Sequence, residues 1–268
     1  MTQEIIIVCI LTFLIHLVGT YSLAIRIVGL RTNKWSMAYA LFNILALVTR
    51  LSTTFQAPLL AKTIELNILN KATADTMDFR YILWASTLGM LIGGLTIPVF
   101  HRLLGVAVER YYVHRSFLRL FLSIFNWKRF IGLRQHLVIP HRNNWNAFKE
   151  PIVPTKVIIF NLLSQAILTV GVLSTLYAGY INPDLRSTSA SMSGFINGFA
   201  AIVLVIVVDP SIALLSDEVM NKNVSPVFFR KYIIVLTAVR ILGTLLSQIL
   251  LLPLAHLVVW MSETLAAT

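Results

Sequence analysis

Ionisable side chains lie inside long apolar stretches of this sequence, where charge is costly and usually functional. Among them are Arg50, Arg240, His16 and Asp209. At the helical rise of 1.5 Å per residue, Arg50 lies about 21 Å and Arg240 about 13 Å into its stretch. His16 lies near the middle of its own stretch. Asp209 lies close to one end, directly before Pro210, and is the only acid in these stretches.

Two arginines facing one acid leave excess positive charge, which predicts a visiting anion. Arginine presents a planar fork of donors that suits phosphate oxygens. In the competing interpretation, Arg240 pairs with Asp209, and Arg50 is satisfied by backbone carbonyls or by Gln56. A histidine such as His16 more often serves packing or hydrogen bonding. The predicted substrate-binding residues are Arg50, Arg240, Gln56, Asp209, His16 and Asn197.

Motifs for catalysis are missing from the sequence. It contains neither a Gly-rich Walker loop nor a His-Glu-x-x-His zinc motif. It also lacks paired Asp-rich motifs for magnesium, and no Ser or Cys nucleophile lies near a paired histidine. We therefore predict a conduit without cofactor or metal rather than an enzyme. A membrane-embedded lipid-modifying enzyme that uses Asp209 and a histidine stays an alternative.

The composition predicts that helices in a bilayer position these residues. Of 268 residues, 57% are hydrophobic and 12% are charged, against roughly 25% charged in soluble proteins. The mean hydropathy is +0.80. We expect one polytopic membrane domain over 1–268. The net charge of +11 reflects basic loops, so nucleic acid is not an expected partner. Glu4 and the missing Ala-x-Ala site argue against a cleaved signal peptide, and Cys9 alone forms no internal disulfide.

Six apolar stretches are long enough to cross about 30 Å of hydrocarbon as helices. They are 5–25, 36–61, 81–104, 155–180, 189–215 and 232–260. Sixteen of the 22 Lys and Arg residues fall in the first, third and fifth loops, four fall on the other side, and two lie within spans. Positive charge marks the cytoplasmic side. We therefore predict that the odd loops are cytoplasmic and both termini extracellular.

The long third loop, 105–154, contains an amphipathic pattern. Its apolar residues at helical spacing are Val113, Phe117, Leu120, Phe121 and Ile124. This predicts a helix lying in the cytoplasmic interface, with its basic side toward anionic headgroups. Two roles stay open, namely topology and anchoring, or recruitment of an anionic lipid substrate.

Two polar stretches carry a family resemblance. They are 49–62 (TRLSTTFQAPLLAK) and 182–210 (NPDLRSTSASMSGFINGFAAIVLVIVVDP). With the length and span pattern of the whole chain, they resemble the Amj family of bacterial lipid II flippases. The resemblance implies a bacterial cytoplasmic membrane protein that carries the undecaprenyl-diphosphate-linked peptidoglycan precursor from the inner to the outer leaflet. It implies a possible association with cell-wall synthesis machinery, and it supplies no catalytic residues.

Other functions stay open on the residues alone. They are a secondary transporter of a soluble anion, the lipid-modifying enzyme above, and a regulatory or scaffold protein. Without an ATPase motif, net flux would need an ion gradient, the membrane potential or consumption of substrate outside. Gly194 and Gly198 form a Gly-x-x-x-Gly pair, which favours packing inside the bundle over dimerisation. The oligomeric state is open.

Overall fold

A computed structural model of the chain describes residues 2–70, 76–114 and 153–267. Within these ranges the regular structure is entirely helical, and six segments are long and apolar enough to cross a membrane. The predicted class, an all-α membrane protein with about six spans, is confirmed. The amphipathic helix predicted within 105–154 lies largely outside the described residues.

The first half of the bundle consists of three long helices. They are α1 (Gln3–Thr32), α2 (Trp35–Leu69) and α3 (Thr76–His114). Asn33 ends α1 with a φ of 53°, a left-handed conformation that Asn tolerates better than most residues. The chain therefore reverses direction at once, and α1 packs along α2 as well as α3.

The second half begins and ends with long helices and has a broken span between them. The long helices are α6 (Thr155–Ile181) and α10 (Pro226–Ala266). The broken span comprises η3 (Pro183–Leu185), α7 (Arg186–Ser191), α8 (Ser193–Val203), η4 (Leu204–Val208) and α9 (Asp209–Met220). At α10 the side chain of Ser225 caps the helix by accepting from Phe228 N at 3.2 Å, with Pro226 in the first position.

The break in the fifth span has a local cause. Segment η4 is a π-helix, and α9 begins at Asp209 with Pro210 directly behind it. Proline has no backbone N–H to donate to the preceding turn. A π-turn in a helix commonly marks a functional site. The broken helix thus delivers Asp209 at a point where the backbone is irregular.

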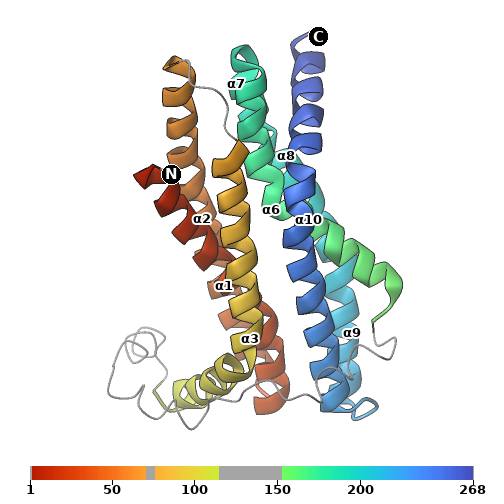
Figure 1. The fold of residues 1–268 in the computed structure, drawn as a ribbon. Coiled ribbons are helices and arrows are strands. Elements are labelled where there is room, and N and C mark those ends of the chain that lie inside the picture. The colour runs from red at the N-terminus through yellow and green to blue at the C-terminus, as the bar shows by residue number, and fades with distance from the viewer. Residues whose placement is uncertain (1, 71–75, 115–152, 268) are drawn as a thin grey trace.

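Successive spans alternate in direction, so the two chain ends lie toward the same end of the bundle (Figure 1). The turns from α1 to α2 and from α9 to α10 lie at the opposite end, which we call the basic end. Helices α1–α3 gather on one side and α6–α10 on the other, with α3 packed against α10. An even number of spans agrees with the predicted topology. Which end faces the cytoplasm stays a prediction.

Two apolar clusters stabilise the bundle. The cluster at the basic end includes Leu23, Ile212, Phe229 and Leu236. The cluster at the far end includes Ile5, Val8, Leu60, Leu83, Leu173 and Leu251. Apolar side chains also cover much of the outside, among them Phe55, Phe199, Ile206 and Ile249, which are 61–70% exposed. Such a surface suits lipid rather than water.

The glycines that allow close contact between helices are not the predicted pair, Gly194 and Gly198. A Cβ on Gly89 would clash with the backbone of Phe13, and one on Gly243 would lie 2.8 Å from Leu162 O. A Cβ on Gly194 or Gly198 would meet no atom within 4 Å. The expectation that Gly194 and Gly198 pack inside the bundle is therefore wrong. Their side of α8 faces outward.

Candidate functional site

A polar layer separates the two apolar clusters. Its buried polar residues come from α1, α3, α6 and α10. They are Thr12, Thr20, Ser86, Thr87, Asn161, Ser164, Gln165, Thr169, Thr237, Thr244 and Ser247. Polar groups at this depth lower stability unless they are hydrogen-bonded. We call this band the central polar layer, and Asp209, Arg240 and His16, three of the ionisable residues predicted from the sequence, belong to it or border it.

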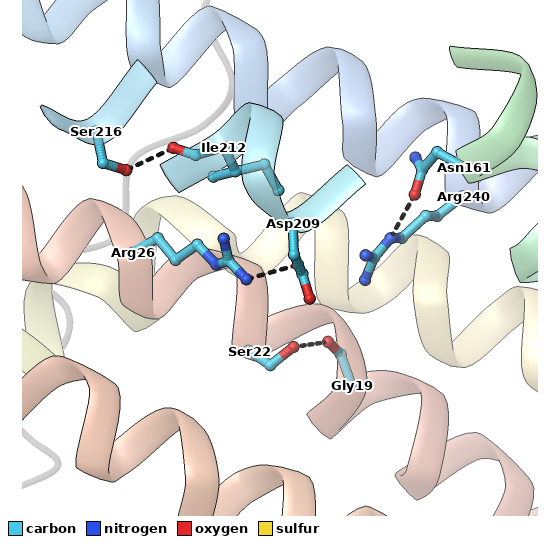
Figure 2. Close-up of polar contacts among 8 residues, drawn as sticks. All are labelled: Gly19, Ser22, Arg26, Asn161, Asp209, Ile212, Ser216 and Arg240. Carbon is cyan, nitrogen blue, oxygen red and sulfur yellow. Dashed lines mark hydrogen bonds and ion pairs between the residues drawn. The ribbon is translucent and has the colours of Figure 1, made fainter. Parts of the chain in front are cut away.

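Asp209 forms an ion pair with Arg26 at the edge of this layer nearest the basic end. Arg26 Nη2 lies 2.7 Å from Asp209 Oδ1 (Figure 2). The ring of Phe42 lies on another side of the guanidinium, 5.5 Å from its carbon. Arg26 is 20% exposed and Asp209 39%. The pair thus joins α1 to α9, with an aromatic contact to α2.

Arg240 points toward the same carboxylate from α10 (Figure 2). Its Nε donates to Asn161 Oδ1 at 3.0 Å, and Asn161 Nδ2 donates to Leu236 O at 3.1 Å. The amide therefore holds Arg240 in one orientation. Asp209 attracts this guanidinium, and Arg26 repels it. One acid lies beside two arginines, which leaves a net positive charge.

His16 occupies the middle of the central polar layer. Its Nδ1 donates to Thr12 O at 2.9 Å, and its Nε2 lies 3.5 Å from Thr169 Oγ1 on α6. Thr169 also accepts from Gln165 Nε2 at 3.1 Å. The ring thus connects α1 to α6 through neutral polar groups.

Gln56 continues the line of polar groups toward the far end. It is 8% exposed, and its Nε2 donates to Thr12 Oγ1 at 2.7 Å. Thr12 and Arg26 are fourteen residues apart on α1, which is about 21 Å along the helix axis. The hydrocarbon region is about 30 Å thick. Polar side chains from Gln56 and Thr12, through His16, to Arg26 and Asp209 therefore extend over most of the thickness of the bundle. We call this series of residues the polar track.

Two predicted site residues, Arg50 and Asn197, are not among the residues assigned to the polar track. Arg50 falls within α2, and its side chain is not among the described residues. Asn197 on α8 points toward α6, where a Cβ on Gly171 would collide with its Oδ1. That oxygen is buried and has no hydrogen-bond partner within the described residues. The structure thus places Arg240 beside Asp209, and it places His16 and Gln56 together around Thr12. It places Asn197 at the contact of α6 with α8.

A cleft of about 470 Å³ lies at the ion pair, between α2 and the η4–α9 segment. We call it the paired cleft, because Arg26 and Asp209 both line it. The rest of its lining is Trp35, Ala38, Tyr39, Phe42, Val205, Pro210, Ala213, Ser216 and Asp217. Trp35 Nε1 is buried and lacks a partner among the described residues. Aromatic and aliphatic walls beside a charged pair suit an amphiphilic ligand better than a small hydrated ion.

Comparison with known proteins shows the family. Residues 11–262 match the family described as "Amj: Alternate to MurJ". The chain belongs to the Amj family. It is 30% identical over 267 residues to a protein of Bacillus subtilis (strain 168) named "Lipid II flippase Amj", covering 98% of this chain and 97% of that one. No solved structure matches.

The two stretches that resemble the Amj family lie on the helices that flank the paired cleft. Residues 49–62 belong to α2, and residues 182–210 extend from η3 to the start of α9. The cleft is lined by the first turns of α2 and by Val205, Asp209 and neighbours. The resemblance based on these stretches is confirmed by the match over most of the chain.

Sequence reasoning missed Arg26, which the loop count assigned to the first loop. The structure places it inside α1, where it takes the partnership with Asp209 that the competing interpretation gave to Arg240. It also missed the polar partners on α1 and α6. A usable signal was present, because Thr12, His16 and Thr20 recur every four residues, as do Asn161, Gln165 and Thr169.

Proposed function

We propose that this chain is a lipid II flippase, moving the undecaprenyl-diphosphate-linked peptidoglycan precursor between the leaflets of the bacterial cytoplasmic membrane. The observation that carries the proposal is the polar track that joins the paired cleft to the middle of the bundle in a member of the Amj family. A diphosphate with a large polar headgroup cannot cross hydrocarbon unaided. The track offers it partners at successive depths.

The diphosphate would meet Arg26 and Arg240, with Asp209 as the exchangeable counter-ion. The carboxylate of Asp209 binds Arg26 at 2.7 Å and attracts Arg240. An arriving diphosphate carries more negative charge and more acceptor oxygens than one carboxylate, so it competes for both guanidiniums. Asp209 then weakens the binding of the diphosphate by pairing with Arg26 again. A site that binds too tightly would trap its cargo.

The rest of the predicted site would serve passage beyond the arginines. His16 and Gln56 offer neutral donors and acceptors further along α1. Arg50 would add a cation on α2. On α8, Asn197 has a buried oxygen that finds no hydrogen-bond partner in the described part of the chain. The polyprenyl tail would stay in lipid, beside the exposed apolar side chains Tyr39 and Val205 that line the paired cleft. Both termini would face the outside, with the basic end in the cytoplasm.

Residue placement gives little support to the enzyme alternative. His16 lies ten residues from Arg26, the partner of Asp209, which is about 15 Å along α1. His256 is exposed on α10. Neither histidine is placed to share chemistry with Asp209.

Complementation tests the proposal. The full chain is expressed in bacteria depleted of every other lipid II flippase, and growth and membrane levels are measured together. We expect the wild type to restore growth, Arg240→Ala to abolish it, and Arg240→Lys to restore part of it, because lysine keeps the charge but loses the fork. The matched control is Arg186→Ala, which removes an arginine 4.0 Å from Glu65 and outside the track. It should grow like the wild type.

The ion pair needs its own comparison, in which Arg26→Ala is tested beside the double variant Arg26→Ala with Asp209→Ala. If Arg26 only neutralises Asp209, removing both restores growth. If Arg26 meets the diphosphate, the double variant stays defective although it inserts normally. Failure of an inserted wild type would overturn the flippase proposal, and uptake of soluble anions would then be measured first.

A further inference from the structure

A second cleft, separate from the paired cleft, lies at the basic end between α1, α3 and α10. Its volume is about 610 Å³. It is lined by Arg31, His101, Arg102, Arg230, Ile27, Leu30 and Pro226. We call it the basic cleft. It shares no lining residue with the paired cleft.

The four basic residues of this cleft come from three different helices. Arg31 stands in the last turn of α1, Arg230 in the first turns of α10, and His101 with Arg102 in α3. Each of the three arginines acts electrostatically on His101. His101 Nδ1 donates to Ile97 O at 2.9 Å, which fixes the orientation of the ring. The fold thus gathers like charges around one small volume.

No acid lines the basic cleft among the described residues. Like charges this close repel one another, and an anion relieves the repulsion. The cleft also receives the start of α10 at Pro226. A helix N-terminus carries partial positive charge, so it adds to the attraction for an anion.

The depth and the walls of the cleft indicate what carries that anion. Arg31 stands in the last turn of α1 and Arg230 in the first turns of α10, so the cleft lies where these two spans end and begin. Ile27 and Leu30 form an apolar wall beside the charges. Charged arginines next to aliphatic side chains at the end of the spans match a phosphate at the depth of lipid headgroups, where basic pockets between helices bind anionic lipids.

We propose that the basic cleft is a phosphate-binding site, occupied by the headgroup phosphate of an anionic membrane lipid. Free phosphate or diphosphate offers the same chemistry from solution. The assignment rests on this cleft alone and does not depend on the flippase proposal. Binding here would hold α1, α3 and α10 together at the basic end.

Lipid binding to the purified full chain in neutral detergent tests the proposal. The probes are phosphatidylglycerol, phosphatidylcholine, inorganic phosphate and inorganic diphosphate, and bound molecules are counted by native mass spectrometry over a titration. The cleft variant is Arg31→Gln with Arg230→Gln, since both side chains are exposed and their loss leaves packing intact. The matched control is Lys156→Gln with Lys231→Gln, which removes equal charge outside the cleft.

We expect phosphatidylglycerol to bind the wild type and the control with the same affinity. Its affinity for the cleft variant should be at least about tenfold lower. Competition by inorganic diphosphate, lost in the cleft variant, would assign the same phosphate site to a soluble ligand instead of a lipid. Equal weakening in the cleft variant and the control would show bulk charge attraction and overturn the site. Binding that phosphatidylcholine matches, or no binding at all, would overturn it as well.

Discussion

The two clefts use arginine in opposite ways although both include the last turns of α1. In the paired cleft, Arg26 has an acid at 2.7 Å and an aromatic ring at 5.5 Å. In the basic cleft, Arg31 stands with two other arginines and a histidine and without an acid in the described lining. Five residues of one helix separate these two environments.

The difference follows from depth. Arg26 lies more than one turn inside the end of α1 and is 20% exposed. It needs a counter-charge, because water solvates it poorly there. Arg31 is exposed at the helix end, where water or headgroups solvate it without a protein partner. An arginine that already has a carboxylate partner suits the exchange and release of a ligand anion. An arginine without an acidic partner suits the binding of an anion from outside the protein.

The largest effect is expected when the paired cleft is made to resemble the basic cleft. Asp209→Ala leaves Arg26 and Arg240 without their shared acid. We expect a loss of about 2 kcal/mol in unfolding free energy, less than the 3–5 kcal/mol of a fully buried pair because Asp209 is 39% exposed. Thermal unfolding in detergent measures it through the reaction of a thiol-specific dye with Cys9, the only cysteine.

The control for this change is Asp217→Ala, which removes an exposed acid from the lining of the same cleft. It should alter stability little, since surface charges contribute weakly. Equal losses in the two variants would mean that the pairing of Asp209 with Arg26 does not stabilise the bundle.

A middle-sized effect is expected when the support of Arg240 is removed. Asn161→Leu keeps the number and branching of the side-chain heavy atoms but removes the side-chain hydrogen bonds to Arg240 Nε and Leu236 O. We expect a loss of about 1–2 kcal/mol in the same unfolding assay, together with slower growth in complementation. The growth defect distinguishes positioning of Arg240 from simple packing.

Its control is Asn67→Leu, which breaks the 2.8 Å bond from Asn67 Nδ2 to Tyr180 Oη at the far end. Stability should fall in that variant by a similar amount, whereas growth should stay at the wild-type level. Normal growth of an inserted Asn161→Leu variant would contradict the role given to the amide.

The smallest effect is expected in the basic cleft. Arg31→Gln with Arg230→Gln relieves repulsion, so the melting temperature in lipid-free detergent should rise at low salt, by on the order of a degree. The rise should vanish in about 1 M salt, where charges are screened within about 3 Å. Lys156→Gln with Lys231→Gln should show no such rise. A fall at low salt in the cleft variant would indicate hidden acidic partners and would weaken the contrast between the clefts.

The sequence by itself determined the class of the protein and its number of spans. Apolar length and the scarcity of charge leave few alternatives, because a bilayer accepts only helices or closed barrels and each crossing helix needs about 20 apolar residues. Two polar stretches were enough to indicate the Amj family. The sequence also identified Arg240, Asp209 and His16 as unusual, since charge within a span is visible without knowing its neighbours.

Only the tertiary structure decided which of these groups meet. The ion pair of Arg26 with Asp209 joins residues 183 positions apart, and the bond from Arg240 to Asn161 joins residues 79 positions apart. Such pairing depends on how helices tilt and rotate against one another, which the summed packing of both apolar clusters sets. Gly194 and Gly198 illustrate the same limit. Their spacing permits close packing, but the direction in which α8 faces left them without a neighbour.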